Sequence, residues 1–240
     1  MEASIRQRLL AVNNEFYERF GGSFSGTRFG PQPGWDRIIH YFPKRGSVLD
    51  LGCGNGRLAL FLDDHVEKVR YVGLERSGTL LEIAREKTRD LRHVTTEFFE
   101  MDLSAAKWRR ASGYFDVVTA LAVLHHMPGF QSRAAFVYAA GQCMNPKGFL
   151  ILSNWRFMHS PRMQRKLVPW QAIGLSEDDV EESDYLLDWK KDGCGYRYVH
   201  QLDEAEVEAL AANAGLEVVM QFVADGREGD LSLYSVLKRV

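Results

Sequence analysis

The segment 48–56 constrains this 240-residue chain most, because an apolar stretch runs directly into three glycines at alternate positions. Residues 47–51 predict a short buried strand, and residues 57–63 predict a helix. Gly52, Gly54 and Gly56 therefore fall in a strand-to-helix turn, where glycine lets the backbone bend tightly and approach a ligand closely. The N-terminus of the following helix favours a ligand carboxylate. The segment predicts a small-molecule site at the carboxyl end of a strand.

Strands and helices alternate through most of the chain, which indicates crossover connections and a mostly parallel sheet. The pattern predicts strands over 47–51, 69–74, 94–100, 115–120 and 149–155, with helices over 57–63, 80–88 and 131–144. A last helix over 204–214 precedes two strands, 216–224 and 232–238, which a polar turn joins as a hairpin. We therefore expect an α/β, three-layer, Rossmann-like fold. Its sheet would be seven-stranded and mostly parallel, with an antiparallel C-terminal hairpin strand.

The composition, with 45% hydrophobic and 26% charged residues, is that of a soluble globular protein. Cys53, Cys143 and Cys194 lie far apart without a CxxC spacing, so we expect neither disulfides nor a metal site. The N-terminus lacks the apolar region of a signal peptide, and no run approaches the roughly 18 apolar residues of a membrane span. We expect a cytoplasmic protein that does not bind membranes.

Three carboxylates lie at or just after the ends of the first three predicted strands: Asp50, Glu75 and Asp102. Asp50 can accept a hydrogen bond or offset a ligand's ammonium charge. Glu75 can bind both hydroxyls of a ribose, and Asp102 can accept a hydrogen bond from an adenine amine. Leu121 ends the fourth strand and can lie beneath the adenine. Any one of these could be an ordinary turn residue at a strand end, but together and in this order they favour a nucleoside-containing ligand.

The glycine spacing distinguishes between cofactors. A dinucleotide site needs GxGxxG, and Arg57 stands where the third glycine would be, which disfavours a nicotinamide oxidoreductase. The GxGxG turn with its three carboxylates resembles the class I S-adenosylmethionine-dependent methyltransferases, across residues 47–155 and the terminal hairpin. The resemblance implies that S-adenosylmethionine is the cofactor. It also implies that the cofactor is held by Asp50, Gly52, Gly54, Gly56, Glu75, Arg76, Asp102, Leu103 and Leu121.

Other residues are candidates for binding the methyl acceptor. Arg28 lies in a glycine-rich loop and can bind a carboxylate or phosphate through two parallel hydrogen bonds, although it can also be a surface arginine. His125 or His126 can orient the acceptor or act as a base, or else support the adenine. Trp155 and Trp170 can stack on a base, although isolated tryptophans are more often part of a core.

The order of these pieces resembles the tRNA wobble-uridine carboxyl methyltransferases, which convert 5-carboxymethyluridine to its methyl ester. The matching motifs are Phe24-Ser25-x-Thr27-Arg28-x-x-Pro31-x-Pro33, Ala122-Val123-x-His125-His126, Val168-Pro169-Trp170 and Arg197-Tyr198-x-His200. The resemblance implies a tRNA anticodon loop as partner, and eukaryotic members of the family also work with a small partner protein. It implies an acceptor pocket lined by Arg28, His125 or His126, Trp155, Arg197, Tyr198 and His200. The segment 197–200 can alternatively be an edge strand that covers the sheet.

The distribution of charge leaves other acceptors open. The net charge of −2 does not favour a protein coated in positive charge for nucleic acid. Residues 156–170 carry four arginines and lysines without an acid, whereas residues 176–192 carry eight acids against two lysines. One alternative is a small-molecule O- or N-methyltransferase with His125 or His126 as general base. Another is a subunit that binds S-adenosylmethionine without catalysing transfer.

Two segments depart from the alternation of strands and helices. An amphipathic helix is predicted over 4–20. Residues 21–33 are predicted to lack regular structure, and a short helix is predicted over 35–41. Residues 156–200 are interpreted as an insertion. We therefore expect an N-terminal helical cap and acceptor loop at 1–46, a donor-binding Rossmann-like core at 47–155, and an insertion over the acceptor site at 156–200. The C-terminal helix and β-hairpin at 201–240 would complete the core.

Overall fold

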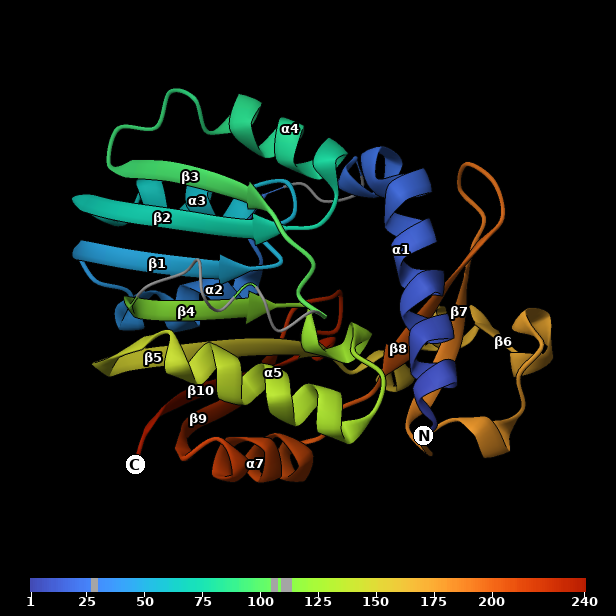
Figure 1. The fold of residues 1–240 in the computed structure, drawn as a ribbon. Coiled ribbons are helices and arrows are strands. Elements are labelled where there is room, and N and C mark those ends of the chain that lie inside the picture. The colour runs from blue at the N-terminus through green and yellow to red at the C-terminus, as the bar shows by residue number, and fades with distance from the viewer. Residues whose placement is uncertain (27–29, 105–107, 109–113) are drawn as a thin grey trace.

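A computed structural model describes residues 1–26, 30–104, 108 and 114–240. Seven strands form one sheet in the order β3-β2-β1-β4-β5-β10-β9 (Figure 1). Strands β1 to β5 are parallel, whereas β10 pairs antiparallel with both β5 and β9. This confirms the expected fold, including the C-terminal hairpin. The strands are β1 (Arg45–Leu51), β2 (Lys68–Glu75), β3 (Val94–Glu100), β4 (Phe115–Leu121), β5 (Met144–Trp155), β9 (Leu216–Ala224) and β10 (Ser232–Arg239).

Helices cover both faces of this sheet. One face packs against α2 (Pro33–Ile38), α3 (Arg57–Asp63) and α4 (Gly78–Lys87), and the other against α5 (Phe130–Gln142) and α7 (Glu204–Asn213). Each face buries its own apolar cluster, and this burial is the main force that holds the three layers together. Short 3-10 turns, η1 (Ile39–Tyr41) and η3 (Leu124–His126), follow α2 and β4.

The first helix, α1 (Ala3–Ser25), is longer than predicted. The sequence pattern placed its end at residue 20 because Gly21 and Gly22 follow. In the structure Gly21 is buried beside α4, where an added Cβ would lie 3.4 Å from the Ser77 Oγ atom. The glycine thus permits a close approach between helices rather than ending one. Helix α1 crosses the side of the sheet at which the parallel strands end (Figure 1).

Residues 156–200 form a second, three-stranded antiparallel sheet that the sequence pattern did not predict. Its strands are β6 (Leu167–Val168), β7 (Asp184–Trp189) and β8 (Gly195–His200), preceded by the single-turn helix α6 (Pro161–Gln164). The 3-10 turn η4 (Phe157–His159) precedes α6. Two further 3-10 turns, η5 (Trp170–Ile173) and η6 (Glu177–Asp179), lie between β6 and β7. Strand β8 lies against α1 (Figure 1). This sheet therefore stands at the same end of the molecule as the glycine-rich turn.

Strand β5 begins at Met144, five positions before the predicted start at Phe149, and α5 ends at Gln142. Among the described residues, no helix combines the length and the apolar character that a bilayer crossing requires.

Candidate functional site

A cavity of about 640 Å³ opens at the carboxyl ends of the parallel strands. Its lining comes from the glycine-rich turn after β1, from the ends of β2, β4 and β5, and from α1 and the small sheet. In an open α/β sheet this is where ligands bind, because the loops that leave the strands converge there. The cavity is therefore the candidate site, and it joins the predicted donor residues to part of the predicted acceptor residues.

The glycine-rich turn has a backbone conformation that only glycine adopts easily. The φ angles of Gly52, Gly54 and Gly56 are 77, 54 and 77 degrees, which all lie in the left-handed region. Gly52 and Gly54 line the cavity. A Cβ on Gly52 would lie 2.4 Å from Val123, whereas nothing lies within 4 Å of one on Gly54. Gly56 does not line the cavity; it packs against Ala84 and lets α3 approach α4.

Asp50 lies at the bottom of the cavity with 3% of its surface exposed. Its Oδ1 atom accepts a hydrogen bond of 2.7 Å from the Thr119 hydroxyl, and its Oδ2 atom accepts one from the Tyr71 hydroxyl. Burial raises the pKa of Asp50, and these two hydroxyls oppose the rise. The carboxylate is thus held rigidly by β2 and β4.

Glu75 is held by the backbone around it. Its Oε2 atom accepts from the Gly54 N–H at 3.2 Å, and its Oε1 atom accepts from the Ser77 N–H at 2.8 Å. Burial raises the pKa of Glu75, and these backbone hydrogen bonds oppose the rise. The carboxylate therefore lies against the glycine-rich turn, with a fixed orientation.

Asp102 lines the same cavity beyond β3. Its Oδ1 atom accepts from the Ser104 N–H at 2.9 Å and from the Ser104 hydroxyl at 2.6 Å. Arg76 lies 3.6 Å from its Oδ2 atom. Leu103 and Leu121 also line this part of the cavity. The carboxylates that were predicted from three strand ends are therefore brought together at one edge of the sheet.

On the other side of the cavity lie three of the predicted acceptor residues, His126, Trp155 and Arg197. Arg197 is only 2% exposed, and its guanidinium carbon lies 4.8 Å from the Phe16 ring centre and 5.4 Å from that of Trp155. Burial lowers the pKa of Arg197, and the Tyr17 hydroxyl, to which it is hydrogen-bonded, opposes that. Arginine keeps its charge even so. The cavity wall thus contains a cation enclosed by aromatic rings.

His126 is held at both ring nitrogens. Nδ1 lies 3.1 Å from the Tyr198 carbonyl oxygen, and Nε2 lies 3.0 Å from the Tyr17 hydroxyl. A carbonyl only accepts, so Nδ1 carries a proton that it donates to Tyr198. The neutral tautomer then has its lone pair on Nε2, where it accepts from Tyr17. Tyr17, on α1, was missed by the sequence reasoning, which considered only the apolar residues of that helix.

The remaining acceptor candidates that the structure describes lie outside the cavity lining. His125 is fully buried, stacks on Trp155 with ring centres 4.8 Å apart, and accepts from the Trp155 N–H at 3.4 Å. Tyr198 and His200 do not line the cavity either. Side chains alternate along β8, and those of Tyr198 and His200 point away from the face that carries Arg197. Arg28 falls outside the described residues, and Trp170 is buried in the cluster between α1 and β7.

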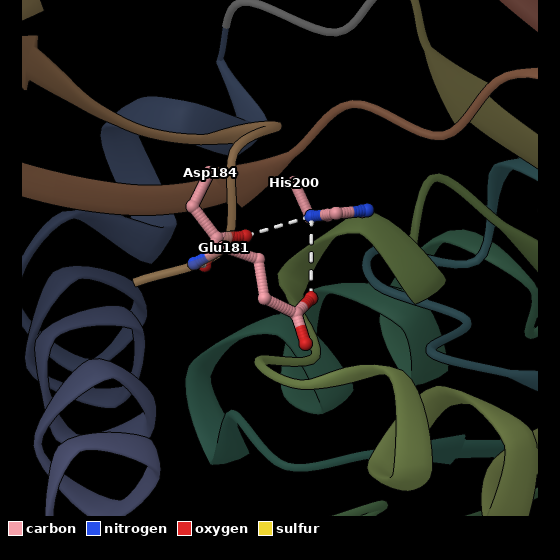
Figure 2. Close-up of side chains that lie close together, drawn as sticks. All are labelled: Glu181, Asp184 and His200. Atoms are coloured by element: carbon pink, nitrogen blue, oxygen red, sulfur yellow. Dashed lines mark hydrogen bonds and ion pairs between the residues drawn. The ribbon is translucent and has the colours of Figure 1, made fainter. Parts of the chain in front are cut away.

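His200 instead joins a buried ion-pair network. Its Nδ1 atom lies 2.7 Å from Asp184 Oδ1, and its Nε2 atom lies 2.8 Å from Glu206 Oε2. Glu181 is near as well, 3.9 Å from Nδ1 (Figure 2). Since carboxylates face both ring nitrogens, both nitrogens carry protons and the ring is an imidazolium. Arg133 completes the network with hydrogen bonds of 2.7 Å to Glu206 and 2.8 Å to Glu181.

Glu181, Asp184 and His200 are close enough to share a metal ion. However, the four carboxylate oxygens already accept hydrogen bonds: those of Glu181 from Phe130 N–H and Arg133, and those of Asp184 from Tyr198 and Glu181 N–H. With a guanidinium among them, these residues form a salt-bridge network between the small sheet and the core.

Comparison with known proteins identifies the fold and the domain. Residues 48–148 match the family of methyltransferase domains. The chain is 31% identical over 143 residues to a tRNA (carboxymethyluridine(34)-5-O)-methyltransferase from Macaca fascicularis, over 59% of this chain and 19% of that protein. It is 27% identical over 229 residues to a putative methyltransferase from Encephalitozoon cuniculi, with 94% of both covered. A solved S-adenosylmethionine-dependent methyltransferase from Methanosarcina mazei matches with a TM-score of 0.67 at 18% identity, over 88% of this chain and 99% of that one.

The chain spans less than a third of the length of the first four tRNA methyltransferases that it matches, between 19% and 31%. Residues 48–148 are therefore similar to methyltransferase domains, and the solved structure shares the fold of this chain.

Proposed function

We propose that this chain esterifies the carboxylate of 5-carboxymethyluridine at the wobble position of tRNA. The similarity to tRNA carboxymethyluridine methyltransferases supports the choice of acceptor. The observation that carries the proposal is Arg197, a buried cation in the wall of the cavity. A planar guanidinium in a poorly hydrated site favours a carboxylate, to which it can donate two parallel hydrogen bonds. A neutral amine or phenol would gain less from it, because it carries no charge that pairs with the guanidinium.

The residues on the opposite side of the cavity fit S-adenosylmethionine. The turn at Gly54 leaves open space that a side chain would fill, and the helix α3 that follows suits the carboxylate of the methionine portion. Asp50, which lines the cavity, would offset the charge of its ammonium group. Glu75 would bind the ribose hydroxyls, and Asp102 would accept from the adenine amine, with Leu103 and Leu121 against the ring. When bound, the cofactor supplies a sulfonium methyl group that a carboxylate oxygen can attack, with the C–S electron pair leaving on sulfur.

The other residues of the cavity would then position the acceptor. A carboxylate is ionised at neutral pH, so no residue needs to remove a proton from it. In the neutral tautomer of His126, the Nε2 atom accepts from Tyr17, which suits a role in orientation rather than as a base. Arg197 would bind the acceptor carboxylate, while Trp155 and Tyr17 offer rings on which a uracil can stack. The gain in rate would come mainly from holding the reacting atoms in line.

The test is methyl transfer to an RNA stem-loop that carries 5-carboxymethyluridine at the wobble position. We expect a product that mild alkali converts back to the acid, because esters hydrolyse and methylated nitrogens do not. A stem-loop with the corresponding amide, 5-carbamoylmethyluridine, should not react. Arg197→Gln should lower kcat/KM by roughly a hundredfold, as expected when a charged contact to the reacting group is removed.

Arg92→Gln, at an exposed cation beside the amino end of β3, is the matched control and should behave as wild type. Cofactor binding by calorimetry and the melting temperature show whether Arg197→Gln is still folded. Transfer to small phenols or amines, with none to the modified RNA, would contradict the proposal in favour of a small-molecule methyltransferase. Cofactor binding without transfer to any acceptor would favour a non-catalytic subunit.

A further inference from the structure

Basic side chains gather at the mouth of the cavity, on the side formed by the small sheet. They come from α6 with the turn after it and from the end of β7 with the turn after it. Three of them, Arg162, Lys166 and Lys190, line both the cavity and an adjoining surface hollow, so the two are continuous. We call this set the basic rim; its members are Arg162, Arg165, Lys166, Lys190 and Lys191.

Asp188 is the acid of segment 176–192 that forms an ion pair with a member of this rim, and three other acids of the segment are held elsewhere. Glu181 and Asp184 point into the salt-bridge network with Arg133 and His200. Asp179 is held by Ser176 at the start of η6. Of the acids in this fully described segment, only Asp188 lines the cavity or the hollow, and it already pairs with Lys190 at 2.6 Å. The acidic segment therefore leaves most of the basic rim available to a negatively charged partner.

Aromatic rings lie directly inside the rim. Trp189 lines the cavity beside Lys166, whose Nζ atom lies 5.6 Å from the ring centre, and Trp155 and Tyr17 follow further in. Cations that bind phosphates next to rings that stack on bases are the combination that binds single-stranded nucleic acid. A compact small-molecule acceptor would need the rings and Arg197, but it would not reach exposed cations as far out as Arg165.

We propose that the basic rim binds the backbone phosphates of single-stranded RNA on either side of the nucleotide that enters the cavity. The inference rests on the proposed function for the identity of that nucleotide, and it adds the residues that hold the rest of the RNA. The target nucleotide would leave its stack in the loop, as it must for an enzyme to reach an atom of the base. The rim phosphate contacts are independent of base sequence, so selectivity would come from the cavity.

The test compares two triple variants of equal charge change. The rim variant is Arg162→Gln/Arg165→Gln/Lys191→Gln, which leaves the Lys190–Asp188 pair intact. The control variant is Arg89→Gln/Arg92→Gln/Lys147→Gln, at exposed residues near the amino ends of the strands, on the side of the sheet opposite the cavity. The probe is a fluorescent RNA stem-loop with an unmodified wobble uridine, so that binding is measured by anisotropy without any methyl transfer.

Each lost phosphate contact with a single strand should reduce the slope of log Kd against log salt by about 0.7, so the rim variant should lose about 2 from that slope. Its affinity at low salt should fall, while the control variant should match the wild type. Equal binding by the rim variant and the control would overturn the inference. Loss of binding by the rim variant, with no transfer to the modified RNA by the wild type, would instead leave the rim in place and contradict the proposed reaction. A rim variant that binds RNA normally but loses an acidic protein partner would assign the rim to that partner.

Discussion

Tyr17 connects the two polar residues that face the acceptor side of the cavity. Its hydroxyl donates to His126 Nε2, 3.0 Å away, and its oxygen is hydrogen-bonded to Arg197. A hydroxyl can do both, because it has one proton and two lone pairs. This arrangement determines the rotation of both groups at once. Tyr17 would therefore be a positioning residue for the acceptor rather than a base.

Tyr17→Phe should reduce kcat/KM for the modified stem-loop by roughly tenfold, because Arg197 and His126 each lose a hydrogen bond that orients them. The affinity for S-adenosylmethionine should not change, since Tyr17 lies on the acceptor side. Steady-state kinetics and calorimetry measure the two effects, with Tyr138→Phe at an exposed position on α5 as the control. An equal loss in cofactor affinity would show that Tyr17 supports the whole cavity instead.

The sequence predicted single residues well where the backbone alone fixes their place. Asp50, Glu75 and Asp102 lie at or just after the ends of three parallel strands, and parallel strands end at one edge, so their meeting could be expected. Arg197, Tyr198 and His200 are a different case, because a contiguous motif on a strand alternates between two faces. Only Arg197 faces the cavity. Which side of β8 faces the cavity depends on the position of the second sheet, which the sequence did not predict. The spacing of Asn13 and Tyr17, four residues apart on one helix, was the available signal for the residues that were missed.

At the scale of elements, the side chain of Asn13 fastens α1 to the backbone of β8. Asn13 is buried, and its Oδ1 atom accepts from the Tyr198 N–H at 2.9 Å while its Nδ2 atom donates to the Tyr198 carbonyl at 3.1 Å. The same Nδ2 atom lies 3.3 Å from the His126 carbonyl oxygen. The amide thus replaces a neighbouring strand along this part of β8 and places Tyr17, one helical turn further on, against His126.

Asn13→Ala should lower the free energy of unfolding by about 2 kcal/mol, because it leaves the buried Tyr198 backbone groups without these partners. Urea denaturation measures the loss, with the exposed Gln7→Ala on the same helix as the control. Methyl transfer should fall as well in the folded fraction, since α1 carries Tyr17. A loss of stability no greater than that of the control would mean that α1 is held mainly by its apolar face.

The alternation of strands and helices predicted the large sheet to within a few residues, because its buried strands and amphipathic helices have distinct periods. The small sheet lacked such a signal. Strand β6 has only two residues, and β7 is buried along almost its whole length, so it shows no alternation. The stability of the small sheet depends on α1, on the core and on the salt-bridge network, whose residues are distant in sequence.

At the scale of the whole molecule, that network joins the small sheet to the core. Asp184 and His200 belong to β7 and β8, Glu181 precedes β7, and Arg133 and Glu206 belong to α5 and α7. The small sheet carries Arg197, and α6 and the turns next to β6 and β7 carry the basic rim. The position of these groups over the cavity therefore depends on ionised side chains that lie outside it.

The ionisation of the network sets the pH range over which it stabilises the fold. Burial alone would lower the pKa of His200, but hydrogen bonds to Asp184 and Glu206 outweigh it and raise the pKa above the ordinary 6.5. Burial would raise the pKa of Glu206, but His200 and Arg133 outweigh it and hold the pKa below the ordinary 4.5. The stabilisation from His200 is complete below pH 6.5 and is lost as the pH rises through the folded-state pKa of His200. The stabilisation from Glu206 is complete above pH 4.5 and is lost as the pH falls through the folded-state pKa of Glu206. Both are complete between these two values.

His200→Gln should therefore destabilise the protein most at about pH 6, and the gap from wild type should narrow toward about pH 8. The slope cannot exceed about 1.4 kcal/mol per pH unit, because one proton is involved. Urea denaturation across this range measures the gap, and His40→Gln, at an exposed histidine, should show no such trend. A gap independent of pH would mean that His200 is neutral and only packs in place. Because the difference between two proteins is compared, the titration of Asp50 and Glu75, which both share, cancels from the result.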